Sequence, residues 1–244
     1  MVNIIVIKFM EFLRKIINTI HRYWVQRSSK AYLNYLRKSG FKIGDNTYLQ
    51  SPKTFRIDLT RPSLITIGSD CRFNVRNSII AHDVVSRVFI KKYNDFLPSE
   101  GRINIGNNVI FGSDVTVLKG VTIGDNCIIG LGSVVTRDIP ANSVAIGAPA
   151  KVVCTLDEFY EKRKKKAIEE SFEYARSIVE RYGRRPIPAD FWDSFVFFVS
   201  GKDIDQYPEI PFRRQLGATY EHYRKHHVAR YATFDEFLKA AGID

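Results

Sequence analysis

The residue best suited to acid–base chemistry is a histidine in the stretch "NSIIAHDVV", where His82 is followed directly by Asp83. An imidazole titrates near neutral pH, so it can take a proton from a hydroxyl group that attacks a carbonyl carbon. The other histidines lie nearer the ends of the chain, at His21, His222, His226 and His227. His82 is therefore the first candidate for a catalytic base, with Asp83 as a second-rank candidate.

The surrounding sequence repeats every six residues. Each hexad has one large apolar residue, a smaller residue two positions earlier, and a turn rich in Gly, Asn and Asp. Residues two apart in a strand share a face, and those turn residues tolerate a left-handed backbone. The pattern predicts short strands that form a parallel solenoid with three hexads per coil. From Ile105 onward the large positions are Ile105, Phe111, Val117, Ile123, Ile129 and Val135.

The same period extends upstream through Ile43, Leu49, Ile67, Phe73, Ile79 and Val85. Residues 86–102 break the period, so we expect a loop there within a solenoid of residues 41–153. The register points Cys71, Cys127 and Ser133 inward as small core residues, which makes none of them a nucleophile. It places Asp83 where a small inward side chain is expected, so either the register bends or Asp83 is held there for a purpose.

The repeat, together with "IGLGSVVTRDIP" and "GAPAKVV", resembles the hexapeptide-repeat acyltransferases of the sugar and polysaccharide O-acetyltransferase type. The resemblance implies a mainly β fold, a left-handed parallel β-helix flanked by N-terminal and C-terminal helices. It also implies acetyl transfer from acetyl-CoA, a homotrimer, and active sites between neighbouring solenoids. His82 is similar in position to the catalytic histidine of that family, which accompanies such a loop.

The same resemblance places five residues where related sugar acetyltransferases contact CoA: Ser113, Leu131, Thr136, Arg137 and Lys151. Leu131 stands where alanine is usual, so it narrows the groove but still offers backbone atoms. Arg137 and Lys151 suit the anionic end of CoA, although ordinary surface charge is the alternative explanation. Because no outward cysteine offers a nucleophile, we expect direct transfer in a ternary complex, without an acetyl-enzyme.

The basic charge of the chain is concentrated outside the repeat. Residues 1–40 carry a net charge of +7 and residues 161–185 a net charge of +4, which together make the net charge of +11. The pattern of residues 1–40 predicts a basic amphipathic helical segment that packs on protein or touches an anionic membrane surface. It has neither the ~20 apolar residues of a membrane span nor the form of a secretory signal. With three unpaired cysteines, this favours a cytoplasmic protein, at the inner membrane face if the helix binds lipid.

The remaining segment, residues 154–244, is predicted to be helical and rich in aromatic residues. A helix should run from Leu156 to Gly183, and Thr233 with Glu236 fits a capping box at the start of another. The aromatic residues predict a small packed cap, or a platform on which sugars stack. His222 and His226 would share a helix face, but the motif lacks an acidic partner and no metal is expected.

These features favour an O-acetyltransferase that moves an acetyl group from acetyl-CoA to a saccharide hydroxyl, in a cell-surface polysaccharide unit or its precursor. No nucleic-acid partner is expected. Two alternatives stay open at this point: N-acetylation of an amino sugar or nucleotide sugar, and a non-catalytic scaffold that binds polyanions. A zinc enzyme on the same solenoid would need three histidines on its walls, and only His82 lies there.

Overall fold

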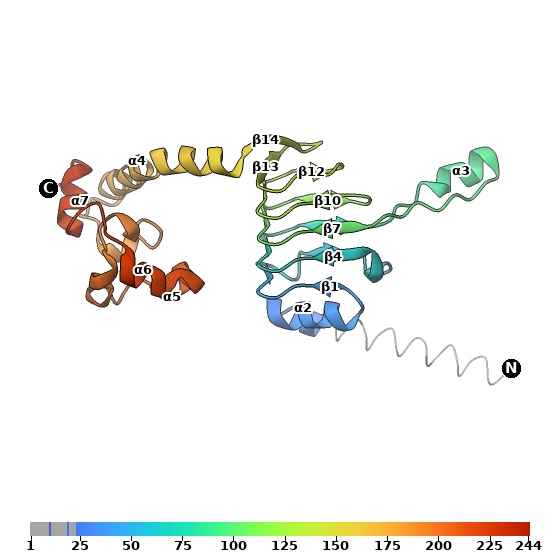
Figure 1. The fold of residues 1–244 in the computed structure, drawn as a ribbon, viewed down its shortest axis with the longest axis horizontal. Helices are drawn as coiled ribbons and strands as arrows, with labels where there is room; N and C mark the ends of the chain where they lie inside the picture. The colour runs from blue at the N-terminus through green and yellow to red at the C-terminus, as the bar shows by residue number, and fades with distance from the viewer. Residues whose placement is uncertain (1–9, 11–18, 20–22) are drawn as a thin grey trace. The chain divides into compact units, whose positions relative to one another are not determined.

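The computed structural model describes Met10, Thr19 and residues 23–244 (Figure 1). The chain divides into two compact units, Met1–Phe159 and Tyr160–Asp244. Most of the predicted N-terminal basic helix lies outside the described residues. None of the described helices is both long enough and apolar enough to cross a membrane.

The first unit is a stack of coils whose strands form three sheets (Figure 1). Sheet A contains β1 (Lys42–Ile43), β4 (Ile65–Ile67), β7 (Ile103–Ile105) and β10 (Thr122–Ile123). Sheet B contains β2 (Tyr48–Leu49), β5 (Arg72–Phe73), β8 (Ile110–Phe111), β11 (Ile128–Ile129), β13 (Ser143–Ile146) and β14 (Lys151–Thr155). Sheet C contains β3 (Arg56–Ile57), β6 (Ser78–Ile80), β9 (Thr116–Leu118) and β12 (Val134–Val135).

Every strand of these sheets pairs in parallel with the equivalent strand of the next coil, except that β14 returns antiparallel on β13. Three parallel sheets built in this way from successive coils form a parallel β-helix. The predicted fold class, mainly β with a β-helix of hexapeptide repeats between helical segments, is confirmed.

The large apolar residue of each hexad points into the coils. Phe73 and Phe111, one above the other, stack with ring centroids 4.4 Å apart and planes 4° apart. Cys71, Cys127 and Ser133 are buried, as the register predicts. Burial raises the pKa of the Cys71 and Cys127 thiols, so both are poor nucleophiles at neutral pH.

The corners between sheets A and B are held by a ladder of asparagines. Asn108, Asn126 and Asn142 adopt left-handed φ values of 53°, 56° and 57°, a region that asparagine tolerates better than most residues. The Asn108 side-chain amide donates to Asn126 Oδ1 at 2.9 Å, and the Asn126 amide donates to Asn142 Oδ1 at 3.1 Å. The turn residues therefore set the corner and also link one coil to the next.

Helix α2 (Ser29–Lys38) covers the N-terminal end of the coils (Figure 1). Its first turn is capped by the Ser28 hydroxyl, which accepts from the Ala31 N–H at 3.4 Å. Tyr32, Leu33 and Leu36 bury the apolar face of the helix in the core of the first unit. The helix thus covers the open end that an unfinished solenoid would expose to water.

The segment predicted as a loop is an arm that contains a helix, α3 (Ser86–Tyr93) (Figure 1). The chain leaves sheet C after β6. The outgoing and returning segments of the arm pair antiparallel at its base, where His82 lies opposite Glu100. The Asp83 N–H donates to the Ser99 carbonyl at 3.0 Å, and the Gly101 N–H donates to the Ala81 carbonyl at 3.0 Å. Val85 was predicted to be an inward residue, and this is wrong. It is 42% exposed because the coil is already interrupted before it.

The second unit contains most of α4 (Leu156–Tyr182). The helix stops directly before Gly183, which has a φ of +60°, within one residue of the predicted end. Its other elements are η2 (Pro188–Asp190), η3 (Phe195–Phe197), η4 (Gly201–Gln206), α5 (Phe212–Leu216), η5 (Gly217–Thr219), α6 (Tyr220–His226) and α7 (Phe234–Ala240). Half of the predicted capping box of α7 is present, since Thr233 Oγ1 accepts from the Glu236 N–H at 3.1 Å. The Glu236 carboxylate accepts from the Ala232 N–H at 2.9 Å and not from that of Thr233. A core of aromatic rings, at its centre Phe191, Phe198 and Phe237, holds these elements together.

Gly68 tests the close approach between coils. A Cβ added there would lie 2.3 Å from the Gly106 carbonyl oxygen, which is backbone and cannot rotate away. Gly68→Ala should therefore lower the free energy of unfolding by about 2–3 kcal/mol. Gly120→Asn is the control, because a Cβ there meets nothing within 4 Å and asparagine tolerates its φ of +79°. Denaturant unfolding with equal losses in the two variants would contradict the account.

Candidate active site

One corner of the β-helix gathers the residues that could do chemistry. It is the corner between sheets C and A, and each coil contributes the residues that follow its sheet C strand. The register pairs Ile57 with Ile79 and Ile80 with Leu118, so equivalent residues of successive coils lie one above another. By this register Asp58, which follows β3, is level with Ile80 of the next coil. Its side chain reaches His82, two residues beyond Ile80, although Asp58 and His82 are 24 residues apart in sequence.

The imidazole of His82 lies against the carboxylate of Asp58, with Nδ1 in hydrogen-bond contact with Oδ2. The Asp58 side chain is only 4% exposed, whereas that of His82 is 32% exposed. An ionised carboxylate only accepts hydrogen bonds, so this contact assigns the proton of a neutral imidazole to Nδ1. Nε2 is left with a lone pair and has no hydrogen-bond partner within the described part of the chain.

The Asp58 carboxylate is kept ionised by its hydrogen bonds. Burial alone would raise its pKa, but bonds from Thr60 and His82 oppose this and hold the pKa below the ordinary value. The Thr60 hydroxyl donates to Oδ1 at 2.6 Å and the Thr60 N–H donates to the same oxygen at 3.1 Å. An acceptor fixed in this way orients the imidazole and stabilises it when it becomes charged.

Asp83 does not contact His82. Its carboxylate pairs with Lys119 and accepts from the Ser99 hydroxyl at 3.0 Å and from the Val85 N–H at 3.1 Å. The hydrogen bond from Lys119 is the main reason that the pKa of Asp83 is lowered. The Asp83 side chain is exposed and does not point into the coil as the hexad register predicts. The register therefore bends at this residue. The carboxylate ties the base of the arm to the next coil.

A cavity of about 230 Å³ opens beside His82, between the corner and the arm. Its lining includes the pair of Arg61 and Glu100, in which Arg61 Nε donates to Glu100 Oε2 at 3.1 Å. Phe96 and Pro98 from the arm add apolar surface to the lining. The cavity can receive a small polar group such as a sugar hydroxyl next to the free nitrogen of the imidazole.

The predicted CoA residues lie on the outside of the same β-helix but do not form one cluster. Ser113 and Leu131 sit at the corner between sheets B and C in successive coils, where the Gly132 N–H donates to the Ser113 carbonyl at 2.9 Å. Thr136 and Arg137 follow β12 at the corner between sheets C and A, the corner that carries His82 two coils earlier. Leu131 is 73% exposed.

Arg137 and Lys151 are exposed and form no ion pair within the part of the chain that the structure describes. Both belong to the last coil, since the Ala150 N–H donates to the Val134 carbonyl at 2.8 Å. Cations without a carboxylate partner are suited to an incoming phosphate group. The role of both residues in CoA binding stays a prediction, and Asp58 was not predicted from the sequence.

Residues 102–137 match the family model described as bacterial transferase hexapeptide (six repeats). These residues are hexapeptide repeats of the bacterial transferase type. Over 137 residues the chain is 38% identical to galactoside O-acetyltransferase from Escherichia coli (strain K12), which covers 55% of this chain and 62% of that protein. A putative acetyltransferase from Bacillus subtilis (strain 168) is 30% identical over 110 residues, covering 45% of this chain and 59% of that protein. The chain thus spans less than two thirds of these relatives.

Among solved structures, a polySia-specific acetyltransferase is 29% identical, with a TM-score of 0.39, and the match covers 46% of this chain and 50% of that one. A galactoside acetyltransferase in complex with coenzyme A is 25% identical, with a TM-score of 0.38, and the match covers 57% of this chain and 78% of that one. In both cases part of the chain has no counterpart in the match.

The lowered pKa of Asp58 makes a prediction about stability. Ionised Asp58 stabilises the folded state above the unfolded pKa of about 3.9, and this contribution is lost as the pH falls through the lower folded pKa. Asp58→Asn cannot titrate, so its unfolding free energy should depend less on pH across this acidic window. Urea unfolding between about pH 2 and 5 measures the difference. If the unfolding free energies of the two proteins depended equally on pH, the pKa of Asp58 would not be lowered by its hydrogen-bond partners in the folded state.

Proposed function

We propose that this protein is an acetyl-CoA-dependent O-acetyltransferase that modifies a saccharide hydroxyl, in a cell-surface polysaccharide unit or its precursor. The observation that carries the proposal is the pair of His82 with a buried, ionised Asp58 beside an accessible cavity. The names of the relatives support it, since they are acetyltransferases and one acts on galactosides.

In the proposed reaction, Nε2 of His82 accepts the proton of the acceptor hydroxyl while its oxygen attacks the thioester carbonyl carbon. The tetrahedral intermediate then collapses, the carbon–sulfur bond breaks, and the imidazolium returns the proton to the CoA thiolate. Asp58 touches only the imidazole, so it is a positioning residue that fixes the tautomer and stabilises the cation. An acetyl-enzyme is unnecessary, because the hydroxyl that His82 deprotonates attacks the thioester directly. Cys71 and Cys127 are buried, and Cys154 on β14 is half-buried.

Acetyl-CoA would bind along the outer wall of the C-terminal coils. Arg137 and Lys151 would pair with its phosphates, since neither has a carboxylate partner among the described residues. Ser113, Leu131 and Thr136 would contact the rest of the molecule. Acetyl-CoA supplies the activated acetyl group, and the residues of the chain bind it and move the proton.

A homotrimer would complete the site in this proposal. Within one chain His82 and the predicted CoA residues Ser113 and Leu131 occupy different corners, and a neighbouring β-helix would bring the two sets together. The exposed arm supports such an assembly, because Phe96 and Leu97 are 67% and 50% exposed. Membrane contact through the N-terminal basic helix stays a prediction.

The role of His82 is tested with full-length protein, acetyl-CoA and a glycan panel read by mass spectrometry. His82→Asn should lower kcat for transfer about 10²–10⁴-fold and leave CoA binding unchanged, because only the general base is lost. Asp58→Asn should lower kcat by a smaller factor, because the imidazole base is still present but is no longer held in its orientation by a carboxylate.

His222→Asn, at an exposed histidine of the second unit, is the matched control and should transfer at the normal rate. Full activity of His82→Asn on a hydroxyl acceptor would overturn the proposed mechanism. Substantial residual activity confined to amine acceptors would favour N-acetylation, since an amine nucleophile depends less on a base.

The CoA wall gives a separate prediction. Arg137→Ala and Lys151→Ala should each weaken CoA binding roughly 3- to 10-fold at low salt, with a smaller effect at high salt, because each removes one charge-assisted contact with phosphate. Lys42→Ala is the control, an exposed lysine on the first coil. Titration calorimetry with CoA measures all three, and unchanged affinity in both wall variants would place the phosphates elsewhere.

A further inference from the structure

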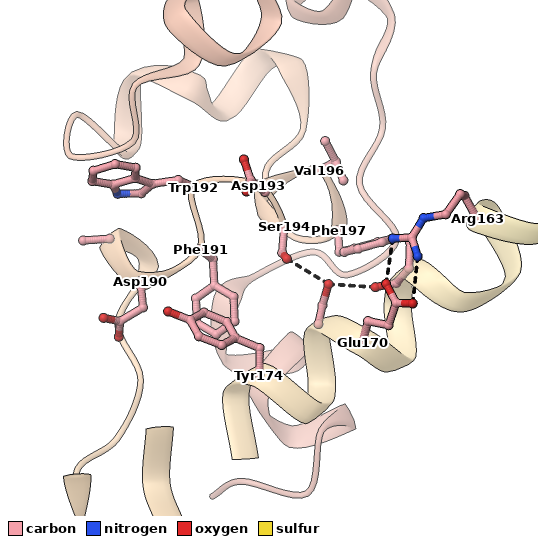
Figure 2. Close-up of a pocket in the computed structure, with 13 residues that line it drawn as sticks. Arg163, Glu170, Tyr174, Asp190, Phe191, Trp192, Asp193, Ser194, Val196 and Phe197 are labelled. Carbon is pink, nitrogen blue, oxygen red and sulfur yellow. Dashed lines mark hydrogen bonds and ion pairs between the residues drawn. The ribbon is translucent and has the colours of Figure 1, made fainter. Parts of the chain in front are cut away.

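A second cavity lies wholly within the second unit, between one face of α4 and residues 189–197 (Figure 2). Its volume is about 740 Å³, which is within the range of small-molecule sites. Small side chains leave this space open: Ala167 and Ser171 on α4, and Ala189 and Ser194 opposite. The Ser171 hydroxyl donates to the Ala167 carbonyl at 2.8 Å and is also hydrogen-bonded to the Ser194 hydroxyl at 2.8 Å, so part of the cavity wall is polar and ordered.

The charged residues at one end of this cavity neutralise each other. Arg163 donates to both carboxylate oxygens of Glu170, at 2.8 and 2.6 Å (Figure 2). At the other end Asp190 is held by two bonds from Arg184, at 2.9 and 2.8 Å. Neither pair leaves an unpaired cation for a phosphate or carboxylate ligand.

Two aromatic side chains of the cavity wall remain accessible. Trp192 is 49% exposed and Tyr174 is 47% exposed, whereas the neighbouring Phe191 is 1% exposed and belongs to the core. The Tyr174 ring meets Phe191 edge-on, with centroids 5.3 Å apart, which fixes its position. In the part of the chain that the structure describes, neither the indole N–H nor the phenol hydroxyl forms a hydrogen bond, so both are available.

An unpaired carboxylate stands beside these rings. Asp193 follows Trp192 directly, lines the cavity and forms no hydrogen bond or ion pair with any described residue. It contrasts with Asp190, whose carboxylate is fully engaged. A carboxylate only accepts hydrogen bonds, so it suits a ligand that offers donors such as hydroxyl groups.

We infer that this cavity is a binding site for a neutral saccharide. The apolar C–H face of a sugar ring would pack on Trp192 or Tyr174, while Asp193 accepts hydrogen bonds from ring hydroxyls and Ser194 adds a further polar contact. An acidic sugar is disfavoured, because it would face Asp193 without a free cation to offset the repulsion. Binding here does not depend on the proposed reaction. A further step, that this site binds part of the polysaccharide that is acetylated at the active site, rests on the proposed function.

The chain contains two tryptophans, Trp24 and Trp192. In full-length Trp24→Phe protein, indole emission therefore reports on Trp192 alone. The probes are a panel of neutral oligosaccharides and, as a contrast, their sialylated forms. At least one neutral oligosaccharide should change the emission saturably, with a Kd near or below about 1 mM, and sialylation should weaken that binding several-fold.

Variants in the Trp24→Phe background locate the site. Asp193→Asn should weaken binding by roughly 5-fold or more, because it replaces a charged acceptor by a neutral amide. Ser177→Ala, on α4 but outside the cavity, is the matched control and should bind normally. His82→Asn should also bind normally, which separates this site from the proposed active site.

The inference is overturned if no neutral oligosaccharide changes the emission up to about 10 mM, if Asp193→Asn binds as well as the parent, or if sialylated probes bind equally well. Binding by wild-type protein that acetylates no saccharide would sustain this site and remove the proposed function. Acetyl transfer to a saccharide without saccharide binding to the second unit would sustain the proposed function and overturn this site.

Discussion

The structure depends on the close stacking of one coil on the next. Parallel strands of neighbouring coils lie about 4.8 Å apart, so equivalent corner residues must fit directly above one another. The glycines at the corner between sheets A and B satisfy this constraint, since a Cβ at Gly68 or Gly106 would enter the atoms of the coil above. The same stacking makes neighbours of residues that are far apart in sequence. Asp58 and His82 are in contact because the register aligns β3 with β6.

A buried carboxylate is costly unless its oxygens are satisfied, and the corner solves this with few groups. Thr60 engages one oxygen of Asp58, and His82 engages the other. The arrangement gives the imidazole a fixed orientation, with one nitrogen committed and the other open toward the cavity. Lys119 and Asp83 then hold the base of the arm against the next coil, which keeps the cavity wall in place.

The hexad period predicted the β-helix and the inward positions of Cys71 and Cys127, because a strand period and its turns are local properties of the sequence. Asp58 escaped prediction for a specific reason. The first coil contains extra residues, and the sequence does not say which corner accommodates them, so the partner of His82 could not be identified by counting. Val85 was wrongly predicted to point inward, because the six-residue period of the sequence continues beyond the point where the chain leaves the sheet. In the second unit, the number of aromatic residues did not distinguish the buried Phe191 from the exposed Trp192, since that depends on tertiary packing.

The central claim is that Asp58 commits Nδ1 of His82 and leaves Nε2 free to act as the base. Long-range ¹H–¹⁵N NMR of the imidazole, in full-length protein at a pH where His82 is neutral, tests this most directly. The account predicts the tautomer with the proton on Nδ1, and a shift toward the other tautomer in Asp58→Asn. A neutral His82 protonated on Nε2 in the wild-type protein would contradict it.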